Sequence, residues 1–484
     1  MSETLALVLP LAAAGLATVV ALVLDGLGRS RSAPVVAGLL LVAGAIPAGI
    51  AATTLEPSKA FGFFILGAGY SGAVCVVLTL AAFSAVVAGA SASSERGTLV
   101  ALIAFSALAA NGLVAAPDPL FMLVALETLA VLGYAIVSVT RTPKSSEAAI
   151  KYFVQGTVAT AIYALGLAGL LGAGLSLLSD VDTASAAHAA GAGPVTAACA
   201  LIVVAFSFKL GAFPFHSWAP DAYEAAPPAG TAFIASATKV AAFTALYTIT
   251  ATLVEPAGVW AEIRFVVAAA AAASVVFGNL AALSQKSYAR MLAFSGIAQV
   301  GYGLTGVVTG NGSATLLFVV AYAIASAGAF AAIESVRARR PRWDGSIAGL
   351  SGLASEAPIL SASLAAILFS MTGIPPLVGF WGKFMVFLTA AGTGWTWLVV
   401  IGVLGSVVSF GYYGRVLRHV YFEEAPETGD VGLASPSSAR GADLIVIVLA
   451  AVIVALGVFL LVNGLVALIG GADSSGFFGL VPPF

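Results

Sequence analysis

The sequence contains very little charge. Only 20 basic and 22 acidic residues are present among 484, which is 9% of the chain, against about 25% in ordinary soluble proteins. Hydrophobic residues make up 60% and the mean hydropathy is +1.06. This composition excludes a soluble enzyme, a disordered chain and a nucleic-acid-binding protein, which would need a basic face. The chain is therefore predicted to lie in a lipid bilayer.

Cysteine and histidine are also scarce. The two cysteines, Cys75 and Cys199, lie in apolar stretches, and the three histidines are far apart in the chain. Iron–sulfur clusters usually need about four thiolates, and structural zinc sites about four Cys or His ligands. We therefore expect no metal or redox centre in this chain, and we expect both cysteines to act as small buried hydrophobes.

Long apolar stretches dominate the rest of the sequence. A membrane-spanning helix needs about 20 mostly apolar residues, and fourteen stretches meet this criterion, although the start of the third is uncertain because 60–70 is also apolar. We expect an all-α polytopic membrane protein with a single membrane domain. The predicted spans are 4–24, 33–53, 71–91, 98–116, 119–140, 148–175, 194–214, 231–251, 262–283, 289–308, 313–335, 357–389, 392–414 and 444–470.

The basic residues predict the orientation in the membrane. Fifteen of them lie in or beside the odd-numbered connections, whereas the even-numbered connections hold only Lys59 and Arg264. Because cytoplasmic loops carry the excess of Lys and Arg, the odd connections are predicted to be cytoplasmic and both termini external. The fifteen are Arg29, Arg31, Arg96, Arg141, Lys144, Lys151, Lys286, Arg290, Arg337, Arg339, Arg340, Arg342, Arg415, Arg418 and Arg440.

Apart from residues near the span ends, four charged residues lie inside the predicted spans: Glu127, Lys209, Lys239 and Lys383. Each charge at a helix centre costs about 2.5–3.5 kcal/mol on insertion scales, so such residues indicate a functional site. Glu127 and Lys239 are each about 12 Å into their helices, near the middle of the bilayer. The alternative is a structural ion pair, or a lysine that reaches the membrane interface.

Two spans carry matching interruptions. The seventh contains Phe-Ser, then Gly, then Pro at 206–214, and the twelfth repeats this order at 369–376. Proline removes a backbone donor and clashes with the preceding turn, so both helices should break there. An unbroken twelfth helix would also place Lys383 about 39 Å from its start, which exceeds the bilayer thickness.

The two breaks predict an internal repeat. They lie five spans apart, and a repeat of an odd number of helices must insert with opposite topology, so we expect two inverted five-helix repeats. Paired interruptions of this kind indicate a transport site. The predicted organisation is 1–115 for the N-terminal helices, 116–252 and 262–414 for the two repeats, and 444–470 for a C-terminal helix.

Protons are the cation that this set of residues suits best. A buried lysine holds its proton less tightly, and a nearby carboxylate restores the affinity, so small movements can load or discharge the site. Metal ions would prefer clustered carboxylate or carbonyl oxygens, and only one acid, Glu127, is predicted to lie deep in the membrane.

Several segments resemble the antiporter-like membrane subunits of respiratory complex I. They are FKLGAFPFHSWAPDAYEAAP (208–227), SATK (236–239), RMLAFSGIAQVGY (290–302) and GIPPLVGFWGKF (373–384). The resemblance extends from about residue 115 to 390. The segment SEAAIKYF (146–153) is similar to the N-type subunits, and the M-type member usually has glutamate where Lys383 stands.

The resemblance implies a role for each site residue. Glu127 matches the carboxylate of the fifth helix and is expected to pair with Lys209 of the broken seventh. Lys239 matches the central lysine of the proton path, and Lys383 the terminal lysine, which we expect to discharge protons to the external face. His216 lies in the motif and either hydrates the path or forms a structural hydrogen bond.

The family also implies the partners. The expected function is proton translocation by a non-redox subunit of a bacterial NADH:quinone oxidoreductase in the cell membrane, beside K-, J- and M-type subunits. FMN, iron–sulfur clusters, NADH and quinone would be bound by partner subunits, and no cofactor is expected here. Two alternatives are the D-type subunit of a multisubunit Na⁺/H⁺ antiporter and, less well supported, a secondary solute transporter.

Overall fold

The computed structural model describes residues 3–55, 58–60, 64–90, 95–116, 118–175, 183–425 and 440–469. Among these residues, thirteen helices are long and apolar enough to cross a membrane, and two shorter apolar helices follow one another as α16 and α17. The first elements are α1 (Glu3–Gly26), α2 (Ala33–Thr54), β1 (Ser58–Ala60), β2 (Phe64–Leu66), α3 (Ala68–Ala90), α4 (Arg96–Val114), α5 (Pro119–Ser138), α6 (Pro143–Gly172), α7 (Thr183–Ala190), α8 (Ala192–Leu210) and α9 (Trp218–Ala225).

The second half of the chain is equally helical. It contains α10 (Pro228–Ala235), α11 (Ala237–Ile249), the π-helical turn η1 (Thr250–Val254), α12 (Trp260–Leu283), α13 (Tyr288–Thr309), α14 (Gly312–Arg339), the 3₁₀ turn η2 (Ala348–Leu350), α15 (Leu353–Glu356), α16 (Pro358–Thr372), α17 (Val378–Gly392), α18 (Thr396–Phe422) and α20 (Arg440–Ile469). The predicted all-α membrane fold is confirmed, with α16 and α17 as the two parts of the broken twelfth span.

Local sequence explains where two helices of the site begin. Asp118 caps α5, because its Oδ1 accepts hydrogen bonds from the N–H groups of Leu120 (2.7 Å) and Phe121 (2.9 Å). Thr142 caps α6 through a reciprocal capping box with Ser145. Side chains of this kind satisfy backbone donors that the first turn of a helix leaves unpaired. α6 consequently starts at Pro143, five residues before the predicted 148.

Other boundaries also differ from the prediction. The antiparallel pair β1–β2 and the start of α3 occupy the stretch where the third span was uncertain. α18 continues to Phe422, eight residues past the predicted 414. Residues 1–2, 426–439 and 470–484 lie outside the described residues. The division into N-terminal helices, two repeats and a C-terminal helix stays a prediction.

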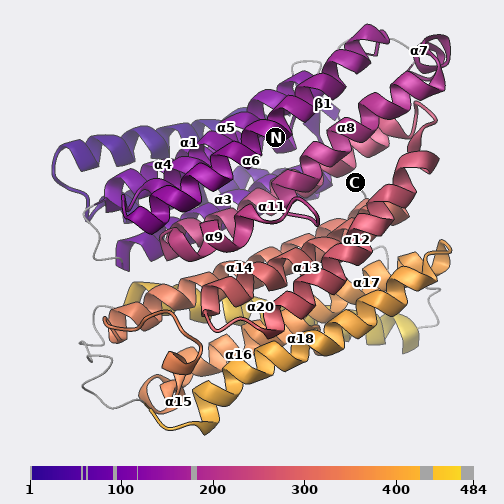
Figure 1. Ribbon diagram of the computed structural model, residues 1–484. Coiled ribbons are helices and arrows are strands. Elements are labelled where there is room, and N and C mark those ends of the chain that lie inside the picture. Colours follow the sequence, from indigo (N-terminus) through magenta and orange to yellow (C-terminus); the bar gives the residue numbers. More distant parts are fainter. Residues whose placement is uncertain are drawn as a thin grey trace.

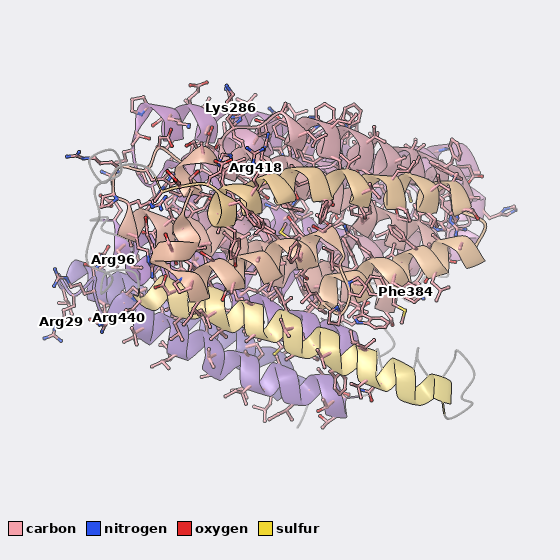
Figure 2. The ribbon with its side chains drawn as sticks, turned by 90° about the horizontal axis from the view of Figure 1, so that it is seen from below. Arg29, Arg96, Lys286, Phe384, Arg418 and Arg440 are labelled. Carbon is pink, nitrogen blue, oxygen red and sulfur yellow. The ribbon has the colours of Figure 1, made fainter. Side chains whose placement is uncertain are left out.

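The spans lie roughly side by side, and the two broken helices run in opposite directions. In Figure 1, α8 comes from the end where α7 lies, whereas α16 starts at the opposite end, beside α15. Arg29, Arg96 and Arg440, all from odd-numbered connections, gather at one end of the bundle in Figure 2. These three residues of the pattern that predicted the orientation lie at the same end of the molecule.

The most buried spans form the centre of the bundle. In the most apolar 18-residue stretch of each span, 94% of residues are buried in α10–α11 and in α13, and 83% in α14. The buried share is only 28% in α1 and 33% in α6 and α18. Helices α1, α6 and α18 are therefore peripheral and expose apolar side chains. Lys239, on α11, consequently lies deep inside protein.

Cysteine labelling tests the orientation. In a variant without the two native cysteines, a membrane-impermeant maleimide should label Glu255→Cys and Thr393→Cys in intact cells, because both lie in even-numbered connections. Ser32→Cys and Ser284→Cys should be labelled only in inside-out vesicles. The reverse pattern would show that the odd-numbered connections are external.

Candidate functional site

The seventh span breaks at a glycine. Gly211 follows α8 with φ of +72°, its N–H donates to the carbonyl of Phe208 (2.9 Å), and Ala212 N–H donates to the carbonyl of Ser207 (2.8 Å). These two bonds form a Schellman motif, which favours glycine because left-handed backbone strains other residues. The chain then turns into α9, where the indole of Trp218 donates to the Phe208 carbonyl (3.1 Å).

The Schellman motif does not use the final carbonyl of α8, and Lys239 binds it. Lys239 is 3% exposed, and its ammonium donates to the carbonyl of Leu210 at 2.5 Å. Ser236, three residues earlier, separates α10 from α11 with φ −120° and ψ −80°. The C-terminal end of a helix carries a partial negative charge, so the end of α8 solvates this ammonium.

The twelfth span breaks in the same way. Gly373 follows α16 with φ of +95°, its N–H donates to the carbonyl of Ser370 (3.0 Å), and Ile374 N–H donates to the carbonyl of Phe369 (3.1 Å). An added Cβ at Gly373 would lie 3.1 Å from the side chain of Lys383. The two similar sequence segments therefore produce the same C-terminal motif in both halves.

Lys383 binds the carbonyls left over at the end of α16. Its ammonium donates to Met371 (3.0 Å) and Thr372 (3.0 Å), and also to the Ser406 hydroxyl on α18 (3.2 Å). The ammonium also lies 4.4 Å from the ring centroid of Tyr302, as a cation–π contact. Lys383 is only 4% exposed, so protein groups replace its hydration shell.

Glu127 and Lys209 face one small cavity between α5, α6 and α8, with room for water. The Glu127 carboxylate accepts a hydrogen bond from the Thr160 hydroxyl (2.5 Å). Among the described ion pairs none joins Glu127 to Lys209 within 4.0 Å, so their expected pairing stays a prediction.

His216 lies apart from this cavity. It belongs to the segment between α8 and α9, where its ring stacks on Phe213 (centroids 5.4 Å apart) and packs against Phe277 (4.4 Å). In the structure, the ring of His216 packs against aromatic side chains. Its role in hydration or hydrogen bonding stays a prediction.

Several residues of the site escaped the sequence prediction. Tyr302 and Gln299 lie in the RMLAFSGIAQVGY segment, which supplies none of the predicted site residues, and Gln299 donates to the Met371 carbonyl (2.9 Å). Thr160 contacts Glu127, and Ser406 contacts Lys383. No sequence signal identifies these two, because hydroxyl side chains are frequent in membrane helices.

An ion cluster formed by α9 and the N-terminal parts of α6 and α13 ties both halves together. Arg290 of α13 binds Asp221 (2.7 Å) and Glu224 (3.3 Å) of α9. Lys151 of α6 also binds Asp221 (3.0 Å), and Lys144 binds Glu224 (3.1 Å). Because α9 directly follows the first break, this cluster fixes the chain on the far side of the break from Lys209.

The cluster keeps its acids ionised. Burial opposes ionisation of Asp221, but hydrogen bonds and charge from Arg290 and Lys151 outweigh it and hold the pKa of this carboxyl below its usual value. A depressed pKa means that the stabilisation is present above the unfolded value of about 3.9 and is lost as the pH falls through the folded pKa. The cluster is therefore intact at neutral pH.

Sequence comparison identifies the family. A family described as "NADH:quinone oxidoreductase/Mrp antiporter, TM" matches residues 116–409, which includes both breaks and all four predicted site residues. The chain belongs to this family of membrane subunits.

Individual relatives in this family are similar over most of the chain. NADH-quinone oxidoreductase subunit N of Rhodospirillum rubrum is 32% identical over 423 residues, covering 84% of this chain and 86% of the relative. A chain of respiratory complex I from Thermus thermophilus superposes with a TM-score of 0.77 at 29% identity. The superposition covers 93% of this chain and 96% of the Thermus chain. A chain of the Mrp complex from Dietzia has the same fold, with a TM-score of 0.75 at 20% identity.

A double-mutant cycle tests the ion cluster of this family member. Asp221→Asn and Arg290→Gln should each lower the thermal stability of the purified protein, and the double variant should lose less than the sum. We expect a coupling of about 1 kcal/mol, because the pair is partly exposed. Strictly additive losses would show that Asp221 and Arg290 do not interact.

Proposed function

We propose that the chain is the N-type antiporter-like membrane subunit of a NADH:quinone oxidoreductase and that it translocates protons without redox chemistry of its own. One observation carries the proposal: two lysines deep in the bundle each donate to one or two backbone carbonyls at the end of a broken helix. NADH oxidation, FMN, iron–sulfur clusters and quinone would then belong to partner subunits.

The relatives support this assignment and its assembly. The similar proteins carry the name NADH-quinone oxidoreductase subunit N, and a similar chain occurs in a respiratory complex I. We infer that the chain assembles beside K-, J- and M-type subunits in the bacterial plasma membrane, with both termini external. Helices α5 and α6 present exposed apolar residues such as Val124, Phe153 and Val158, which suit lipid or a neighbouring subunit.

The proposed path uses the four predicted residues in order. Glu127 and Lys209 share a cavity that has room for water. The side chain of Lys239, from α11, contacts the end of α8. Lys383 follows the second break. α16 contains 15 residues, so its end lies about 22 Å from its predicted cytoplasmic start. We therefore infer that Lys383 is the terminal residue and discharges protons to the external face.

Glu127 should be essential for pumping. Glu127→Gln keeps the size of the side chain but removes the charge, and it should lower proton pumping by about a hundredfold, as expected for loss of a proton-transfer group. Pumping is measured in inside-out vesicles that contain the assembled complex. Glu147→Gln is the control, because Glu147 is an exposed carboxylate on α6 (side chain 68% exposed). Wild-type pumping in Glu127→Gln would remove Glu127 from the path.

Lys239 should be intolerant of both neutral and permanently charged substitutions. Lys239→Ala removes the proton carrier, and Lys239→Arg supplies a group that stays protonated at physiological pH and cannot cycle. Both variants should fail to pump in the same vesicle assay although the complex assembles. If Lys239→Arg pumped like wild type, Lys239 would be a fixed charge instead of a carrier.

A further inference from the structure

The three hydrogen bonds of the Lys383 ammonium go to chemically different acceptors. Two go to the backbone carbonyls of Met371 and Thr372, and the third goes to the hydroxyl of Ser406 (3.2 Å). A carbonyl oxygen can stabilise the charge but has no proton of its own to pass on. A hydroxyl is both donor and acceptor, so it can receive one proton while releasing another.

Ser406 already donates onward. Its hydroxyl is 3.4 Å from the Tyr302 hydroxyl, as donor to acceptor. Tyr302 therefore contacts Lys383 in two ways, through its ring face at 4.4 Å and through Ser406. Ser406 is the link between the lysine and a second hydroxyl.

Neighbouring polar groups hold the Tyr302 hydroxyl in place. Asn279 of α12 hydrogen-bonds to Tyr302 and accepts from the Tyr412 hydroxyl (3.0 Å), while its amide nitrogen donates to the carbonyl of Val275 (2.8 Å). An added Cβ at Gly405 would lie 2.8 Å from the Tyr302 oxygen and 2.9 Å from the Asn279 nitrogen. Gly405 thus allows α18 to approach closely enough for the neighbouring Ser406 to reach Lys383.

We propose that Ser406 is the proton-transfer partner of Lys383 and that Tyr302 is the next group in the transfer. The proposal rests on the proton-translocating function proposed above and adds two residues to it. In the first half, within the described residues, Lys239 donates to the Leu210 carbonyl and to no hydroxyl. The hydroxyl pair is therefore a specific feature of the Lys383 site.

The transfer moves only protons. An N–H bond of the Lys383 ammonium breaks as an O–H bond forms at Ser406, and the original hydroxyl proton of Ser406 passes to the Tyr302 oxygen. Tyr302 in turn releases its own proton to a water molecule. The lysine ends neutral, both hydroxyls are restored, and the charge has moved to the water.

A matched pair of substitutions tests the role of Ser406. Ser406→Thr and Ser406→Val introduce side chains of nearly equal shape, and only threonine keeps a hydroxyl. We expect Ser406→Val and Ser406→Ala to lower pumping in inside-out vesicles by about a hundredfold, whereas Ser406→Thr should retain most of the wild-type rate. Tyr302→Phe, which keeps the ring face, should also pump slowly.

Two further variants separate the possible results. Ser409→Ala removes a buried hydroxyl on the same helix that donates to the Ser406 carbonyl (2.6 Å), and it should pump normally. Lys383→Ala should not pump. Wild-type pumping in Ser406→Ala would overturn the proposal for Ser406 while Lys383→Ala stays inactive. Wild-type pumping in Lys383→Ala would instead remove Lys383 from the proposed path. If Ser406→Thr and Ser406→Val both fail to assemble, the pumping rate of Ser406→Ala alone tests the role of Ser406.

Discussion

An ammonium group inside a bilayer must find its hydrogen-bond acceptors within the protein, because lipid tails offer none. The structure meets this requirement with broken helices. A Schellman motif uses the carbonyls further back in the last turn and leaves those of the final residues free. In α8 the carbonyl of Leu210 accepts from Lys239, and in α16 those of Met371 and Thr372 accept from Lys383, the Met371 carbonyl being shared with Gln299. The breaks and the buried lysines therefore depend on each other.

The two halves reach this arrangement from different helices. Lys239 comes from α11 and is 29 residues from its acceptor, so its contact joins two separately packed helices. Lys383 comes from α17, the continuation of the broken span, and is 11 and 12 residues from its acceptors. Relative movement of α8 and α11 alters the first contact directly. The second changes only when the break itself, or α18 with Ser406, rearranges.

Much of the fold could be predicted from the sequence because its signals are local. Span length follows from apolar composition, the breaks follow from Gly and Pro in two similar segments, and the four buried charges stand out against an apolar background. These features place Lys209 and Lys383 beside the breaks, whereas the contact of Lys239 with the end of α8 was found only in the structure. The resemblance to a family added roles that spacing alone could not supply.

The contacts of the site could not be predicted, since they form between helices distant in sequence. Ser406 and Thr160 lie 23 and 33 residues from the charged partners they contact. Nothing in the chain separates them from other membrane hydroxyls. The expected ion pair between Glu127 and Lys209 also depended on geometry, and the structure places a cavity at this position with the carboxylate bound by Thr160.

The strength of these contacts is well matched to proton transport. A hydrogen bond to a charged group contributes about 1.5–3 kcal/mol, and moving one proton against 100 mV costs about 2.3 kcal/mol. Withdrawal of a single carbonyl from Lys239 or Lys383 thus changes the stability of the ammonium by about the energy that one transferred proton requires. Each acceptor carbonyl belongs to a helix end that is followed by a glycine in the left-handed region, where the chain is not continued by helical hydrogen bonds. In the proposed function, displacement of that helix end is the movement that would switch a lysine between holding and releasing its proton.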